Sequence, residues 1–293
     1  MATTRIGFLG LGVMGSPMAI NLARQFPLTV WNRSQGKLPP LIQAGARVAD
    51  SPAAVLAQSD VVFTMLFNDA AYAPVFESPD FQANLRGKTV INTSSISVDC
   101  STRLSDIVAA AGGTFIEMPV SGSKVPAEMG QLVGMVAGDK DAVDAVRPLL
   151  KPITKTAIYC GPVGMGLKTK YAINTFLITT TAGLAESMHL ARRQGLDLDA
   201  FAQVVDASPM ASAYSKLKVN KMMAEDWSAQ AAIQDCYNLT RLVVDASKTA
   251  GARSPFMELC ATMYKEAIDA GLEGDDMIAL EKLFTKIQTK QAQ

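Results

Sequence analysis

Histidine is almost absent from this chain, which has only one, His189, among 293 residues. A Ser–His–Asp triad, a histidine–aspartate dehydrogenase dyad and a histidine-ligated metal site all need an imidazole at the reacting centre. His189 lies 19 residues after Lys170, the best catalytic candidate, and on a single helix that spacing corresponds to about 28 Å. We therefore expect His189 to have a structural role and any active site to depend on other residue types.

Cysteine, net charge and long apolar runs are also scarce. The cysteines, Cys100, Cys160, Cys236 and Cys260, are far apart and form no CxxC pair, which argues against a disulfide framework or a zinc cluster. Lysine plus arginine (27) equals aspartate plus glutamate (27), so no nucleic-acid or membrane-surface partner is indicated. No apolar run reaches the roughly 18 residues of a membrane span, and a strand near Arg5 leaves no room for a signal peptide. We expect a cytoplasmic protein without a metal, whose 293 residues, 49% of them hydrophobic, suit two domains.

The N-terminal stretch RIGFLGLGVMGSPMAINLA predicts a strand, a tight turn and a helix. Gly10, Gly12 and Gly15 follow the apolar run with the spacing GxGxxG. The first glycine permits the turn, the second lets the backbone approach a pyrophosphate, and the third lets helix and strand pack closely. Because unpaired N–H groups at a helix N-terminus favour phosphate, the turn predicts a dinucleotide site. The expected cofactor contacts are Gly10, Leu11, Gly12, Val13, Met14 and Gly15.

The next predicted strand ends in Asn32, Arg33 and Ser34, where NAD-binding sequences usually have an acidic residue against the ribose 2′-OH. An asparagine removes the repulsion that a carboxylate would exert on a 2′-phosphate. An arginine can bind that phosphate through two hydrogen bonds. These residues favour NADP over NAD, and the alternative is that Arg33 is an ordinary surface arginine.

Strands and helices alternate up to about residue 162. The expected strands cover 59–67, 87–95, 113–123, 131–139 and 157–161, with a helix over 140–150. Such alternation predicts an α/β doubly wound (Rossmann) parallel sheet, in which ligands gather at the carboxyl ends of the strands. The residues expected to line the cofactor at those ends are Met65, Leu66, Asn68, Ser94 and Ser95.

Residues 119–132 are rich in glycine, proline and serine, which predicts an irregular loop. Ser121, Gly122 and Ser123 could supply hydroxyl and backbone N–H donors to a small carboxylate. The alternative is an ordinary long connection between two strands.

A long helix is predicted over residues 163–194. Gly195 follows Arg192 and Arg193, as expected of a helix C-terminus. After Gly195 every periodic segment indicates a helix. We therefore expect an NADP-binding domain over 1–162, an interdomain helix over 163–194 and an all-α domain over 195–293.

Lys170 and Asn174 lie four residues apart on this predicted helix and therefore share one face. A positioned ammonium can stabilise the negative charge that develops on a carbonyl oxygen during hydride transfer, and can deliver the proton. Burial would lower the pKa of such a lysine toward the working pH. The alternative is a solvated helix lysine, a role that suits Lys168 better because it lies about 200° further round the helix axis.

The motifs, in this order, resemble those of the β-hydroxyacid dehydrogenase family. GFLGLGVMGSPMAINL resembles its cofactor signature, PVSGS its substrate loop, and the spacing GxGxxxKxxxN its catalytic signature. Within the family, PVSGSKVPAEMGQL is most similar to the glyoxylate and succinic semialdehyde reductases. The resemblance implies NADPH as cofactor, Lys170 as the acid, Ser121 and Gly122 as carboxylate ligands, and Ser95 beside the nicotinamide.

The resemblance also implies contributions from the helical half. Trp227 and Asp235 are expected at the substrate, and Gln234 stands where many members have a cofactor-binding lysine. Glu117 replaces the usual aspartate before the substrate loop. Family members are commonly dimers or tetramers, so a homodimer or homotetramer is expected.

Three alternative functions remain open. One is an imine reductase or reductive aminase, which shares this architecture but usually lacks the lysine. Another is a dehydrogenase of the 3-hydroxyisobutyrate or tartronate semialdehyde type. The third is a cofactor-binding scaffold without enzymatic activity.

Overall fold

The computed structural model describes residues 3–287, with side chains described as far as Phe284. The chain separates into two units, Met1–Lys170 and Tyr171–Gln293. The boundary falls inside one long helix, α9 (Met165–Arg193), so the expected division at residue 162 with a separate interdomain helix stays a prediction.

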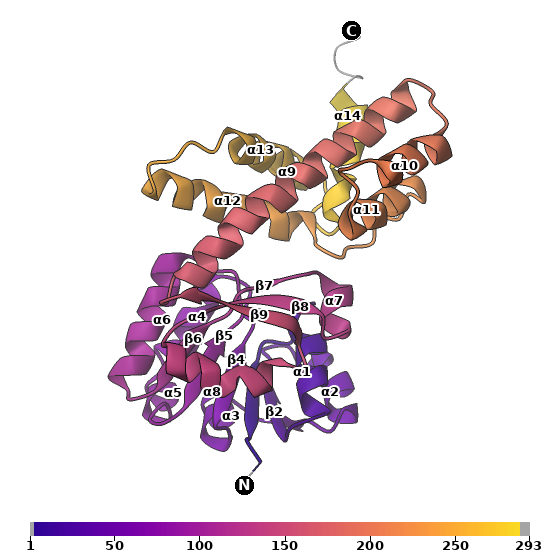
Figure 1. The fold of residues 1–293 in the computed structure, drawn as a ribbon. Helices are drawn as coiled ribbons and strands as arrows, with labels where there is room; N and C mark the ends of the chain where they lie inside the picture. The colour runs from indigo at the N-terminus through magenta and orange to yellow at the C-terminus, as the bar shows by residue number, and fades with distance from the viewer. Residues whose placement is uncertain (1–2, 288–293) are drawn as a thin grey trace. The chain divides into compact units, whose positions relative to one another are not determined.

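The first unit is built on a nine-stranded sheet (Figure 1). Its parallel part has the spatial order of a dinucleotide-binding sheet, with the first and fourth strands adjacent at its centre. In that order the strands are β3 (Arg47–Val48), β2 (Leu28–Trp31), β1 (Ile6–Leu9), β4 (Val61–Thr64), β5 (Thr89–Asn92) and β6 (Thr114–Glu117). The carboxyl ends of β1 and β4 meet where the strand order reverses, which is the expected place for a ligand.

The predicted doubly wound parallel sheet is confirmed in its main part, from β3 to β6, whereas the far edge of the sheet is mixed. The strand β8 (Leu132–Ala137) is antiparallel to both β6 and β7 (Val120–Ser121), and β9 (Thr154–Gly161) is parallel to β8. The helix α7 (Lys124–Glu128) between β7 and β8 is too short to cross a face of the sheet. It packs on α1 (Gly15–Ala23) instead, where Asn21 Nδ2 donates to the carbonyl oxygen of Ala127 at 2.9 Å. The prediction that 119–132 is an irregular loop was therefore wrong, because it contains β7 and α7.

The residues of β1 point alternately to the two faces of the sheet, and helices pack against both faces. Ile6 and Phe8 are buried in one core cluster with Met18 of α1. Gly7 points to the other face, where an added Cβ would lie 2.7 Å from Val55 Cγ1 of α3. The helices of this unit are α1 (Gly15–Ala23), η1 (Gln35–Lys37), α2 (Pro39–Gln43), α3 (Pro52–Gln58), α4 (Asp69–Phe76), α5 (Pro79–Ala83), α6 (Val98–Ala110), α7 and α8 (Lys140–Leu150).

The second unit is helical, as the sequence predicted. Between Arg193 and residue 287 the described chain contains no strand beyond an isolated bridge of Ala232 with Asp276. The helix α9 ends at Arg193, and Gly195 makes the expected C-terminal turn with a φ of +68° and an N–H bond to Arg192 O at 3.1 Å. The remaining elements are α10 (Leu198–Ala207), α11 (Ala213–Met223), α12 (Ile233–Thr249), α13 (Pro255–Asp269), η2 (Met277–Leu280) and α14 (Glu281–Ile287).

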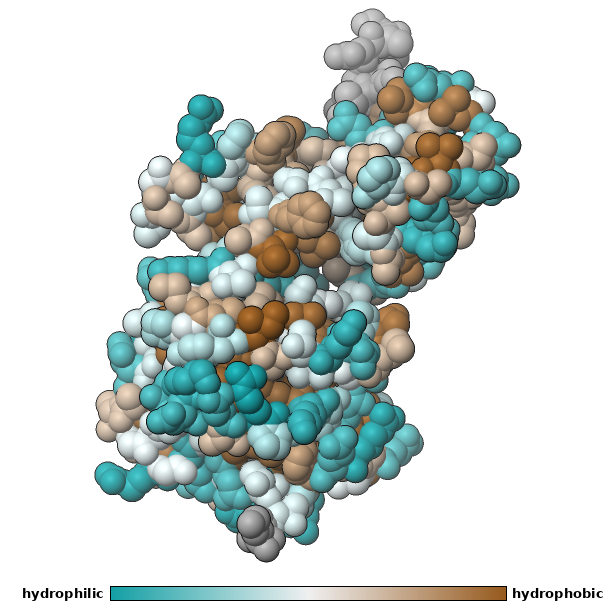
Figure 2. All heavy atoms as spheres, viewed as in Figure 1, coloured by the Kyte–Doolittle hydropathy of each residue, from teal (hydrophilic) through white to brown (hydrophobic). Residues whose placement is uncertain are grey.

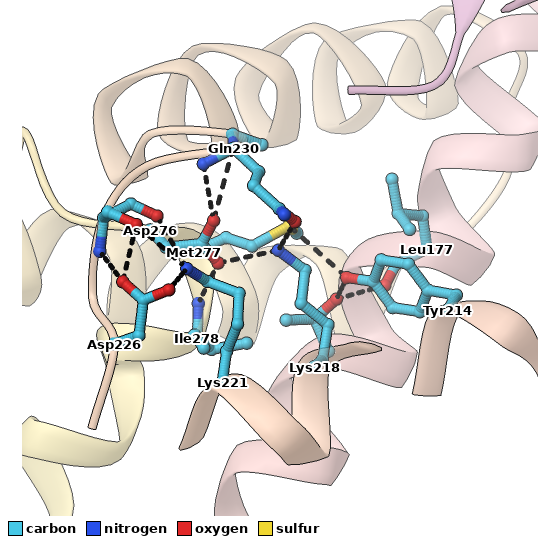
Figure 3. A network of polar contacts seen from close by, with 12 residues as sticks. Leu177, Tyr214, Lys218, Lys221, Asp226, Gln230, Asp276, Met277 and Ile278 are labelled. Atoms are coloured by element: carbon cyan, nitrogen blue, oxygen red, sulfur yellow. Dashed lines mark hydrogen bonds and ion pairs between the residues drawn. The ribbon is translucent and has the colours of Figure 1, made fainter. Parts of the chain in front are cut away.

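A buried ion pair joins three segments of the second unit (Figure 3). Lys218 of α11 lies 2.8 Å from Asp276, and the two side chains are 2% and 0% exposed. Asp276 also accepts backbone N–H bonds from Gln230 (2.8 Å) and Ile278 (3.3 Å). The carboxylate therefore ties α11, the segment before α12 and η2 together, and its lone pairs are satisfied as burial of a charge requires.

The surface of the first unit is mixed. On its visible face, hydrophobic side chains reach the surface in small patches among hydrophilic ones (Figure 2). Scattered apolar exposure of this kind is ordinary for a globular surface. Within residues 3–287, no helix combines the length and apolarity that crossing a membrane requires.

Candidate functional site

The glycine-rich turn after β1 fits the roles predicted for its outer glycines. Gly10 has φ +97°, and an added Cβ would lie 2.3 Å from Met65 O at the end of β4. An added Cβ on Gly15 would lie 2.0 Å from Gly10 O. Both positions therefore need glycine, because the turn folds back against its own backbone and against β4.

Gly12 has a different environment. An added Cβ there would meet no protein atom within 4 Å, and its φ lies outside the left-handed region. Next to it, Val13 is 61% exposed, and the N-terminus of α1 has no side-chain cap at Met14. The space beside Gly12 and the uncapped N–H groups fit a pyrophosphate, which a helix N-terminus stabilises. The residues of this turn therefore fit a dinucleotide.

Asn32 fixes the turn from the end of β2. Its Oδ1 accepts the N–H of Leu11 at 2.8 Å, and its Nδ2 donates to Ser34 O at 2.8 Å. The neutral side chain thus holds both the glycine-rich turn and the segment that carries Arg33. Arg33 and Ser34 are exposed, which leaves them accessible to a phosphate.

A buried hydroxyl network positions the ends of β4 and β5. Ser94 Oγ accepts from Leu66 N at 2.8 Å, donates to Leu66 O at 2.9 Å and accepts from Tyr72 Oη at 2.6 Å. Tyr72 Oη also bonds Asn92 Oδ1 at 2.5 Å, and burial raises the pKa of Tyr72 to about 12, so the phenol stays a donor at neutral pH. The predicted cofactor residues Leu66 and Ser94 are thus brought together, with the Ser94 hydroxyl already engaged by protein groups.

Tyr72 was not among the site residues predicted from the sequence. It lies on α4 and is fully buried in a helix of low polarity, where an aromatic residue is ordinarily part of a core. Its hydroxyl is significant only because α4 brings it to Ser94, 22 residues further along the chain. The signal available in the sequence was the concentration of polar residues, from Asn92 to Ser95, that needed a buried partner.

The other predicted residues at the strand ends have more varied environments. Met65 is half-buried and supplies the carbonyl oxygen against Gly10. Asn68 is exposed, and its Oδ1 caps α4 by accepting Ala71 N at 3.1 Å. Ser95 is half-buried. Burial does not distinguish Ser95 from Met65, and the role of Ser95 beside the nicotinamide stays a prediction.

The predicted carboxylate-binding residues lie on β7 and its turn into α7. Ser121 is paired with Val133 of β8 and is half-buried. Gly122 has φ +128°, and an added Cβ would lie 2.7 Å from Leu132 Cδ2, so only glycine fits there. Ser123 occupies the N-cap position of α7 but makes no side-chain capping bond. Its hydroxyl therefore remains available to an anionic ligand.

The start of α9 rests on the end of β6. Glu117, the last residue of β6, is fully buried, and its carboxylate accepts Leu167 N at 2.9 Å and Gly164 N at 3.2 Å. Ser101 Oγ of α6 donates to the same carboxylate at 2.5 Å. Burial raises the pKa of Glu117, while the bonds from Ser101 and the backbone N–H groups oppose that rise.

The candidate catalytic residues lie on α9. Lys170 is 7% exposed, whereas Lys168 is exposed, so burial separates the two lysines as the sequence predicted. Asn174, one helical turn after Lys170, is fully buried, and neither its Nδ2 nor its Oδ1 has a hydrogen-bond partner among the described residues. An unmet buried polar group costs about 1–3 kcal/mol. Both ends of this amide can therefore serve a ligand.

Two predicted residues of the second unit lie at the start of α12. Gln234 is half-buried, and its Nε2 donates to Asn238 Oδ1 at 3.2 Å. Asp235 is exposed in the first turn of the helix. The amide of Gln234 carries no charge, so the electrostatic contribution of a lysine at this position is missing.

Trp227 lies in a cavity of about 270 Å³ together with Arg192, Glu225, Glu281 and Lys282. Lys282 Nζ is 4.9 Å from the centre of the indole ring. Arg192 and Asn174 are 18 residues apart on α9, which corresponds to about 27 Å. Within the second unit Trp227 therefore lies at the opposite end of α9 from Asn174, and the structure does not bring these two predicted residues together.

His189 lies on α9, half-buried, with its ring centre 5.6 Å from that of Phe284. This aromatic packing is consistent with the structural role expected for it.

Comparison with known proteins agrees with this organisation. Residues 5–161 match the model of the NAD binding domain of 6-phosphogluconate dehydrogenase, and residues 164–284 match the NAD-binding model of NADP-dependent 3-hydroxyisobutyrate dehydrogenase. The chain is 31% identical to glyoxylate/succinic semialdehyde reductase 2 of Arabidopsis thaliana, covering 100% of this chain and 82% of the relative. It is also 31% identical to glyoxylate/succinic semialdehyde reductase 1 of the same plant, covering 94% of this chain and 96% of the relative.

A solved structure of Psf3 in complex with NADP+ and 2-OPP has the same fold, with a TM-score of 0.88, 28% identity and coverage of 95% of this chain and 99% of that one. The match to this structure extends over nearly the whole of both chains. The chain belongs to the β-hydroxyacid dehydrogenase family and is an NAD(P)-dependent oxidoreductase.

Proposed function

We propose that this protein is an NADPH-dependent reductase of small carboxylated aldehydes, such as glyoxylate or succinic semialdehyde, and forms the corresponding hydroxy acids. The observation that carries the proposal is the burial of Lys170, at 7% exposure, in the spacing of the family's catalytic signature. The two Arabidopsis relatives, named for this activity, support the choice of substrate class.

A nicotinamide bound at the glycine-rich turn would supply hydride to a carbonyl carbon. Lys170 donates a proton to the oxygen on which negative charge develops, and a desolvated ammonium is well suited to that task. Asn174, on the same helix face and with both amide groups unpaired, orients the substrate and the lysine. Ser121, Gly122 and Ser123 hold the substrate carboxylate with hydroxyl and backbone N–H donors.

NADP is the proposed cofactor because the segment after β2 has no carboxylate against the ribose. Asn32 uses its amide within the protein, and the exposed Arg33 can form two hydrogen bonds with a 2′-phosphate. Gln234 and Asp235 belong to the proposed cofactor and substrate contacts as well. Trp227 is a weaker candidate for a substrate contact, because it lies at the other end of α9 from Asn174.

The test is NADPH oxidation against a panel of small aldehydes. Lys170→Ala should lower turnover by about 10² to 10⁴, because the proton donor is lost, while NADPH still binds. Lys168→Ala is the matched control, since this exposed lysine lies on the same helix. Near-wild-type turnover by Lys170→Ala would refute the assignment.

The panel should contain glyoxylate, succinic semialdehyde, tartronate semialdehyde and methylmalonate semialdehyde, together with one cyclic imine. Turnover of the imine alone would favour an imine reductase. NADPH binding without turnover of any compound would favour a scaffold.

A cytoplasmic location and a homodimeric or homotetrameric state belong to the same proposal. Size-exclusion chromatography with light scattering measures the oligomeric state directly, and a monomer would contradict it.

A further inference from the structure

We infer that Glu117 is a positioning residue for Lys170, because its buried carboxylate holds the first turn of α9 in the orientation that aims the lysine. The inference rests on the proposed function of Lys170. Glu117 itself touches no reacting group in this account and acts only through the helix.

The carboxylate bridges three elements of the first unit. It ends β6, accepts the Ser101 hydroxyl of α6, and accepts backbone N–H groups at Gly164 and Leu167 at the start of α9. These are N–H groups that the helix cannot satisfy internally, and a negative charge is stabilised at this end of a helix. Glu117 therefore fixes the N-terminus of α9 to the sheet edge.

The two glycines before Lys170 make this close approach possible. Gly164 has φ +93°, which only glycine adopts freely. An added Cβ on Gly166 would lie 2.9 Å from Glu117 Oε1 and 2.5 Å from Met135 O. Any larger residue at 166 would push the helix away from the carboxylate. The close packing of α9 against Glu117 thus explains why the catalytic signature has glycine at both of these positions.

A displacement of the first turn of α9 would also displace Lys170, which lies one helical turn further along. Leu167 and Gly166 lie three and four residues before Lys170, so they neighbour it on the helix surface. A shift of the first turn therefore moves the base of the lysine side chain with it. Misplacement of a catalytic group by about 1 Å can cost about 10² in rate.

The primary test is Glu117→Gln, which keeps the side-chain size but removes the charge and turns an NH₂ toward backbone N–H donors. We expect kcat to fall about 10²-fold, with NADPH Kd within about twofold of wild type. Glu117→Asp keeps the charge on a shorter side chain and should recover about tenfold of the lost kcat. Glu77→Gln is the matched control, because Glu77 is exposed and forms a surface ion pair with Arg103 at 3.4 Å.

A double-mutant cycle separates positioning from general structural damage. If Glu117 acts through Lys170, adding Glu117→Gln to Lys170→Ala should lower kcat no further. An equal fold-loss in both backgrounds would overturn the inference. If Glu117→Gln does not fold by circular dichroism, Ser101→Ala replaces it in the cycle, with an expected kcat loss of about threefold to tenfold from a looser carboxylate.

The two hypotheses fail in different ways. Normal kcat in Glu117→Gln, or in Ser101→Ala where that variant replaces it, together with an impaired Lys170→Ala overturns the positioning role alone. Normal turnover in Lys170→Ala overturns the proposed function, and the positioning role with it.

Discussion

Replacing Gly12 with alanine should separate cofactor binding from folding. The added methyl group meets no protein atom within 4 Å and the backbone is outside the left-handed region, so the folded state gains no strain. Alanine also restricts the unfolded chain, which should leave stability unchanged or raise it by up to about 1 kcal/mol. The methyl group would, however, occupy space that we assign to the pyrophosphate.

The size of the binding loss follows from the hydrogen bonds at stake. Displacing a phosphate from one or two backbone N–H groups loses about 1.5–3 kcal/mol, because hydrogen bonds to a charged group are stronger than neutral ones. That corresponds to about a 10-fold to 150-fold rise in the Kd of NADPH. Fluorescence titration measures the Kd, and urea unfolding measures the stability.

Gly15→Ala is the matched comparison within the same turn. Its Cβ would lie 2.0 Å from Gly10 O, so this variant should lose about 1–3 kcal/mol or more of folding free energy. Wild-type NADPH affinity in Gly12→Ala would refute the placement of the phosphates. A loss of stability in Gly12→Ala equal to that in Gly15→Ala would refute the assignment of open space at Gly12.

Three further predictions concern other parts of the molecule. Arg33→Ala should raise the Kd of NADPH at least tenfold more than that of NADH, because only NADPH has the 2′-phosphate, and equal losses in paired titrations would count against this contact. Asp276→Asn should lower the free energy of unfolding by about 3–5 kcal/mol in urea titrations, because the buried Lys218 would lose its carboxylate partner, and a loss below about 1 kcal/mol would contradict this prediction. Tyr72→Phe should lower stability by about 1–3 kcal/mol and raise the KM for NADPH, because Ser94 Oγ and Asn92 Oδ1 lose the hydroxyl that lies between them; an unchanged KM would show that this network does not position the cofactor edge.

The sequence predicted those features that depend on residues close together in the chain. The turn at Gly10, Gly12 and Gly15, the strands with polar carboxyl ends and the helical second half all follow from local patterns, and the structure confirms their arrangement. The contrast in burial between Lys168 and Lys170 likewise follows from helical periodicity.

Features that depend on partners distant in the chain were not predictable in this way. The sequence marked Glu117 only as an unusual residue, because its partners at Gly164 and Leu167 lie 47 and 50 residues away. The antiparallel β8 was missed because strand direction depends on how β7 and α7 pack, which composition does not encode. Trp227 was placed by resemblance alone, and the cavity that it lines with Arg192, Glu281 and Lys282 depends on residues distant in the chain.

The bond between Asn32 and Leu11 has a consequence for how coenzyme preference can change. Leu11 N–H requires only an oxygen at that distance, and either an amide or a carboxylate supplies one. Aspartate at position 32 would therefore preserve the geometry of the turn. Its negative charge would, however, repel the phosphate of a phosphorylated ribose. The hydrogen bond that Asn32 Nδ2 donates to Ser34 O would be lost. Selectivity for the nucleotide and integrity of its binding turn are thus separable at a single side chain.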